Sequence, residues 1–151
     1  MSKRRSRQRG GSALEMALML PWYLFFFVGT YDWGYYAHAL ISTESAARVA
    51  AEYTSQSSAQ ASNQAMACIL ANEELRIMSN VSGTGTPTCA ASPVIVTAAQ
   101  WGPGQTNTGS ADLQNASQVT VQYTTVGLIP IPGLLKSSTT IYRVVQMRLR
   151  S

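Results

Sequence analysis

The chain has 151 residues, of which 46% are hydrophobic and 12% charged, and its formal net charge is +4. Five of its eleven Lys and Arg residues precede Gly10, so beyond that point six basic residues face seven acidic ones. The folded part is therefore slightly acidic, which argues against a nucleic-acid-binding surface. The length leaves room for one domain beside an apolar segment.

That apolar segment comes directly after the basic leader. Nineteen residues, from Ala13 to Tyr31, contain Glu15 as their only ionisable group apart from two tyrosines. At 1.5 Å per helical residue they span roughly 28 Å, about the thickness of a bilayer's hydrocarbon core. Because Lys and Arg flanking such a segment stay in the cytoplasm, we expect the N-terminus inside and the C-terminus in the periplasm.

The aromatic residues place the outer boundary of this segment. Phe25, Phe26 and Phe27 suit hydrocarbon, whereas Tyr31 and Trp33 suit a membrane–water interface. We therefore predict three parts: a basic leader at residues 1–10, a transmembrane helix at 11–31, and an extracytoplasmic domain at 32–151. The protein is expected in the bacterial inner membrane as a single-pass protein.

Beyond the membrane the helical period continues. Ala46, Val49, Ala50 and Tyr53 follow i, i+3, i+4, i+7 spacing, which predicts one helix from about Ser12 to about Tyr53. Pro21 lies inside it, and neighbouring packing makes proline tolerable in membrane helices. A second helix is predicted from about Ser58 or Ser62 to Ser79, followed by a loop over residues 80–93.

The C-terminal part changes to the period of a strand. Strands are predicted at residues 94–97, 118–126 and 139–149, with a Gly-rich loop at 101–111 and a Pro-Gly turn at 129–133. Val119, Val121 and Tyr123 alternate with polar residues, which is typical of a half-buried strand. The expected fold class is α+β: two helices followed by a small antiparallel three-stranded sheet.

Two cysteines, Cys68 and Cys89, match no metal-binding or CxxC spacing. If the domain lies outside the cytoplasm, the oxidising compartment favours a disulfide between them. Two buried free thiols remain the alternative.

Residues suited to catalysis are scarce. The single histidine, His38, has neither a nucleophile nor an orienting carboxylate at a suggestive spacing. We therefore expect no enzymatic activity, no cofactor and no metal site. Glu15 is the stronger candidate for function, because a carboxylate inside a membrane segment is costly unless it is paired.

The N-terminal pattern resembles a known family. Gly10 and Gly11, then Ser12-Ala13-Leu14-Glu15, lead into the apolar helix, and Gly29-Thr30-Tyr31-Asp32-Trp33-Gly34 and Ser45 to Ala51 follow. These segments are similar to the TadE-like family of minor pilins or pseudopilins, found in tight-adherence (Flp-type) pilus systems. Met16 departs from the pattern, because an aromatic residue is more usual after the glutamate.

The resemblance implies a role in assembly. A prepilin peptidase would cut between Gly10 and Gly11, or between Gly11 and Ser12, and the former makes Glu15 the fifth mature residue. The implied partners are other pilins and minor pilins, the peptidase, the inner-membrane assembly platform and membrane lipid. Glu15 would pair with the new α-amino group of a neighbouring subunit in a low-dielectric helix bundle.

Three alternatives remain open at this point. The carboxylate of Glu15 can instead snorkel to the headgroups, and the chain can be an uncleaved, membrane-anchored scaffold of a secretion system. Signal peptidase could also cut after Ala37-His38-Ala39, although this A-x-A sequence lies behind Asp32 and bulky aromatic residues.

Overall fold

The computed structural model describes residues 9–81, 87, 89–102, 115–126 and 138–150. The chain divides into two compact units, Met1–Tyr35 and Tyr36–Ser151. In its described part, the first unit is purely helical. The second unit combines two helices with a sheet. The α+β class predicted from the sequence is confirmed.

The first helix, α1, covers Arg9–Thr54 and passes through Pro21 without interruption. It matches the predicted helix to within three residues at either end. The part of α1 in the second unit is amphipathic, but its buried side consists of small residues instead of the usual large apolar ones. Ala39, Ala46, Ala47, Ala50 and Ala51 are fully buried there. Small side chains let a helix backbone approach a sheet closely.

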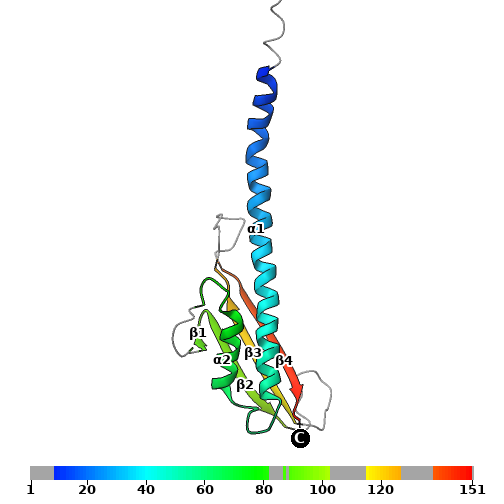
Figure 1. The fold of residues 1–151 in the computed structure, drawn as a ribbon, viewed down its shortest axis with the longest axis vertical. Helices are drawn as coiled ribbons and strands as arrows, with labels where there is room; N and C mark the ends of the chain where they lie inside the picture. The colour runs from blue at the N-terminus through cyan, green and yellow to red at the C-terminus, as the bar shows by residue number, and fades with distance from the viewer. Residues whose placement is uncertain (1–8, 82–86, 88, 103–114, 127–137, 151) are drawn as a thin grey trace, which may run out of the picture. The chain divides into compact units, whose positions relative to one another are not determined.

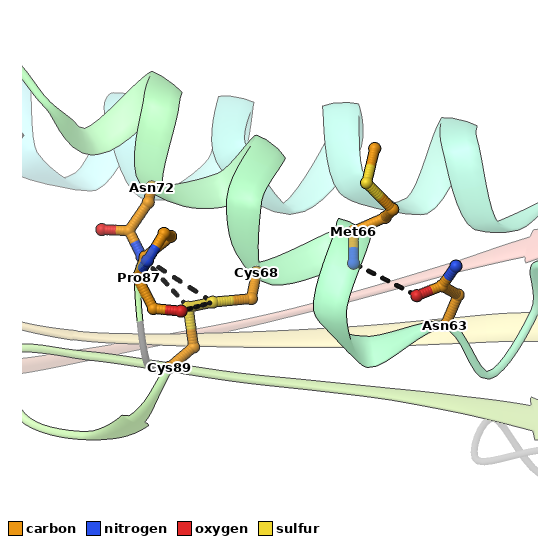
Figure 2. The surroundings of a disulfide bond; sticks show 6 residues. All are labelled: Asn63, Met66, Cys68, Asn72, Pro87 and Cys89. Atoms are coloured by element: carbon orange, nitrogen blue, oxygen red, sulfur yellow. Dashed lines mark hydrogen bonds between the residues drawn. A yellow bond between two sulfur atoms is a disulfide. The ribbon is translucent and has the colours of Figure 1, made fainter. Parts of the chain in front are cut away.

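The second helix, α2, covers Gln64–Leu75 and is shorter than predicted. Asn63 caps its start, because the Asn63 side-chain oxygen accepts a hydrogen bond from the backbone N–H of Met66 at 3.2 Å (Figure 2). Its last turn tightens: the Met78 N–H donates to the carbonyl of Leu75, three residues earlier. The predicted extension to Ser79 is therefore a turn rather than helix.

Among the described residues the sheet contains four antiparallel strands in the order β1-β2-β3-β4, so the predicted three-stranded sheet is wrong by one strand. The strands are β1 (Ala90–Ala91), β2 (Val94–Trp101), β3 (Ala116–Thr124) and β4 (Thr140–Arg148). The additional strand lies in the predicted loop, where Ala90 pairs with Ile95 and Ala91 with Val94. Alanine has a low strand propensity, so the sequence of β1 alone does not predict a strand. β1 forms because it pairs with β2.

The helices cover one face of the sheet, where the core forms (Figure 1). The inward side chains align in rows across β2, β3 and β4: Val94, Tyr123 and Ile141 form one row, and Ala98, Val119 and Val145 another. Val119, Val121 and Tyr123 are fully buried, as the predicted alternation requires. This face packs against the alanines of α1 and against Ala67, Ala71 and Leu75 of α2.

Polar contacts fasten the end of α1 to the sheet. The Ser117 hydroxyl lies 2.7 Å from the Thr54 hydroxyl and 3.2 Å from the carbonyl oxygen of Ala61, and both hydroxyl-bearing residues are fully buried. The Arg150 N–H donates to the carbonyl of Ser55 at 2.9 Å. The segment after α1 is thus held by both β3 and the chain's C-terminal end.

In the second unit, two predicted segments lie wholly or almost wholly outside the described residues. These are the Pro-Gly turn at residues 129–133 and nearly all of the loop at 101–111. Both strands that the turn would join, β3 and β4, agree with prediction to within two residues at each end.

Candidate functional site

The exposed side chains of the first unit are its main feature. Thirteen large hydrophobic residues between Leu14 and Trp33 are exposed, with Phe27, for example, 71% accessible. Burying each such side chain is worth about 2 kcal/mol, so leaving all of them in water would cost roughly 20 kcal/mol or more. This exceeds the stability of a typical domain. Lipid or other protein must therefore cover this part of α1.

In the part of the chain that the structure describes, one helix, Gly11–Thr54, is long and apolar enough to cross a membrane, judged by length and composition. Its most apolar window is exposed throughout, unlike a core helix of a soluble domain. The protein thus has one N-terminal apolar helix suited to a membrane anchor. The direction of insertion stays a prediction.

Glu15 lies on the exposed surface of this helix, six residues after its first residue, Arg9. It shares one side of the helix with Met19, Tyr23 and Phe26. Among the described residues no cation pairs with it. A carboxylate on an otherwise apolar stripe is the arrangement that needs a positive partner once lipid covers the helix.

Gly10 and Gly11 both lie within the first turns of α1. A Cβ placed at Gly11 would meet no atom within 4 Å, so packing within the described chain does not require glycine there. Each glycine destabilises a helix by about 1 kcal/mol relative to alanine. The glycine pair therefore lowers the helix propensity at the start of α1. The leader, residues 1–8, lies outside the described residues.

The cysteines form a second candidate site. Cys68 on α2 and Cys89 before β1 are joined by a disulfide, and their Cα atoms are 5.7 Å apart (Figure 2). Both residues are buried. The bridge connects α2 to the segment that leads into the sheet, across 21 positions of sequence.

Two polar groups surround this bridge. The Asn72 amide nitrogen lies 3.0 Å from the Cys89 sulfur and 3.9 Å from the Cys68 sulfur, and it donates to them (Figure 2). The Pro87 carbonyl oxygen lies 3.2 Å from the Cys68 sulfur. Because a disulfide sulfur carries no hydrogen, this is a contact without a donated proton. Sequence reasoning missed Asn72, although its position four residues after Cys68 on a helix was the available signal.

His38 and its neighbours form no recognisable catalytic arrangement. Its Nδ1 lies 3.5 Å from the hydroxyl of Ser42 on the exposed side of α1, and the two belong to successive turns of one helix. Within the described ranges, no three His, Cys, Asp or Glu residues are grouped so as to hold a metal ion. The absence of enzymatic activity stays an expectation.

A family model described as TadE-like protein matches residues 10–52. Over this segment the chain is similar to the TadE-like family. The segment begins at the glycine pair and includes Glu15, the exposed apolar surface and all five fully buried alanines of α1. No curated protein and no solved structure matches the chain.

The match confirms the resemblance that was inferred from the sequence. It covers less than a third of the chain, so α2 and the whole sheet lie outside the TadE-like segment. The assignments of Gly10, Gly11 and Glu15 stay predictions, as does the oxidation of Cys68 and Cys89 in the cell.

Proposed function

We propose that this TadE-like protein is a minor pilin or pseudopilin of a Tad-type pilus, with a structural and non-enzymatic role in assembly, initiation or regulation. The observation that carries the proposal is the exposed carboxylate of Glu15 within the stretch of α1 from Ala13 to Tyr31, where most of the other exposed side chains are apolar. A helix that serves only as a membrane anchor gains nothing from a charge in its apolar stretch. A helix that packs beside the positive N-terminus of another subunit can pair its carboxylate with that charge.

Cleavage after Gly10 would create that positive group. The new α-amino group lies at Gly11, and the side chain of Glu15 lies about one turn further along the helix. In lipid, a carboxylate and an ammonium group that pair between neighbouring helices relieve the cost that each has alone. The pairing also sets the axial offset between the helices, which is a means of ordering subunits in a filament.

A first experiment tests processing. The full-length protein is expressed with its Tad system, and the N-terminus of the membrane-bound protein is sequenced. We expect Gly11 as the first residue, and the Gly10→Val variant should keep the full leader because a side chain at Gly10 obstructs the peptidase. Gly34→Val is the matched control: a Cβ at Gly34 meets nothing within 4 Å, so this variant should be cut normally.

A second experiment tests the role of Glu15 separately. Glu15→Gln and Glu15→Ala should be inserted at normal levels, because each removes a charge from the membrane segment. Both should lose at least tenfold in co-purification with other pilins while remaining cleaved. Glu52→Gln, on the exposed side of α1 in the second unit, serves as the control.

The two experiments distinguish the competing functions. An intact leader on the wild-type protein would favour an uncleaved, membrane-anchored scaffold of the secretion system. Cleavage together with unchanged co-purification of Glu15→Gln would leave the snorkelling carboxylate as the correct interpretation, and the proposed contact between subunits would be wrong.

A further inference from the structure

Strand β4 forms one edge of the sheet over its whole length. Among the described residues it pairs with β3 alone, from Thr124–Thr140 to Ala116–Arg148. It has no proline, and its pairing with β3 is continuous without a bulge. The free side of such a strand presents backbone N–H and C=O groups that can accept another strand.

Arg143 occupies an unusual position on this edge. In the register of the sheet it continues the inward row of Val96 and Val121, both of which are fully buried. Its neighbours on the same face of β4, Ile141 and Val145, contribute to the core. A guanidinium group thus stands at the end of an apolar row, on the face that the helices cover.

No carboxylate pairs with Arg143 within the described residues. Its guanidinium donates only to the backbone carbonyl of Tyr142, at 3.3 Å. Arg48 pairs with Glu44 on α1, and Arg76, the C-cap of α2, pairs with Glu73. An inward-pointing charge on an edge strand prevents another edge from pairing with it, unless that partner supplies the opposite charge.

A second copy of this chain does not supply that charge from its strands. None of the four strands contains Asp or Glu. Pairing β4 with a second β4 would also bring together two strands that each carry two arginines. On the face of β4 opposite Arg143, an added strand can bury apolar side chains. Tyr142 is 58% and Val144 38% exposed there, and both can contact such side chains.

From these observations we infer that the free edge of β4 is a docking site for an extended segment of a different polypeptide, which places a carboxylate opposite Arg143 and apolar side chains beside Tyr142 and Val144. Arg143 acts as the specificity determinant: it attracts an acidic strand and rejects a second copy. The interface lies outside the TadE-like segment and does not depend on the pilus role.

A peptide probe tests the inference with the purified full-length chain in detergent. The probe is a capped nine-residue peptide of alternating threonine and valine with glutamate at its centre. Its glutamate and threonines share one face and its valines the other. Versions with central glutamine or lysine differ only in charge. We expect the glutamate peptide to bind at least tenfold more tightly than the lysine peptide.

Variants separate charge recognition from general binding. Arg143→Glu should reverse the preference between the two charged peptides, and Arg143→Gln should abolish it. Arg76→Glu, at the exposed C-cap of α2, makes the same change in net charge and should leave the preference unchanged. Equal binding of the three peptides to the wild-type chain, or no binding of any, would overturn the inference.

A crosslinking experiment tests whether Arg143 prevents two copies of the chain from pairing through β4. In a Val144→Cys variant, a short thiol crosslinker joins two chains when their β4 edges are in contact. Adding Arg143→Val should raise the yield of crosslinked dimer several-fold. A yield that does not change, or one already high with Arg143 present, would show that Arg143 does not determine which strand pairs with β4.

Discussion

Removing the disulfide should destabilise the second unit by a predictable amount. The perturbation is the double variant Cys68→Ala/Cys89→Ala, which opens a loop that spans 21 positions of sequence. In the chain-entropy treatment, closing a loop of this length is worth about 3 kcal/mol, because it restricts the unfolded chain. A domain of ordinary stability has roughly 5–15 kcal/mol in total, so the loss is a substantial fraction.

The expected thermal shift follows from the size of the domain. Near the midpoint, 1 kcal/mol corresponds to about 4 °C for a domain slightly above 100 residues, so the variant should melt about 12 °C lower. The measurement is near-ultraviolet circular dichroism of the full-length chain in detergent, since this signal follows the packing of aromatic residues such as Tyr123. The same scan with reductant should lower the wild-type midpoint and leave the double variant unchanged.

One control isolates the bridge from its surroundings. Asn72→Ala removes the amide that contacts the Cys89 sulfur but keeps the bridge, and it should cost only about 1 kcal/mol. A wild-type midpoint that does not move with reductant, under conditions where both thiols become reactive, would refute the loop-entropy reasoning. Full thiol labelling of denatured, unreduced protein would show that the bridge is absent from the cell.

Other predictions concern the core and the topology. Tyr123→Phe should cost about 1–2 kcal/mol in chemical denaturation, because the buried hydroxyl donates to Asn80 Oδ1 at 2.6 Å, and a double-mutant cycle with Asn80→Ala should assign most of the loss to this pair. Ala50→Leu should destabilise by about 1–3 kcal/mol through overpacking, whereas Arg48→Leu on the exposed side should be nearly neutral in the same assay. A reporter that is active only outside the cytoplasm should be active when fused after Ser151, and activity of a cytoplasmic reporter there would reverse the proposed orientation.

The elements with a strong hydrophobic period could be predicted from the sequence. The stripe through Ala46, Ala50 and Tyr53 located α1, and the alternation through Val119 and Val121 located β3, because a buried face imposes its period on the residues. The resemblance in residues 10–52 was equally visible, since it depends on local residue order.

The features that depend on neighbours could not be predicted. Ala90 and Ala91 become a strand only because β2 folds beside them, and β2 extends to Trp101 because β3 supplies partners for Ala98 and Ala99. Strand propensity is low for alanine, so pairing overrides it there. The position of Arg143 beside two buried valines likewise requires the register of three strands, which no single segment of sequence contains.

The attachment of α1 to the sheet has a mechanical consequence. Within the second unit, the helix is held at many points along its length, from Ala39 in the core to the Thr54–Ser117 hydroxyl contact and the Ser55–Arg150 backbone bond. A pull along the helix axis, applied at Tyr36, loads these contacts together in shear rather than one after another. A pull on the helix would therefore be shared among all of these contacts.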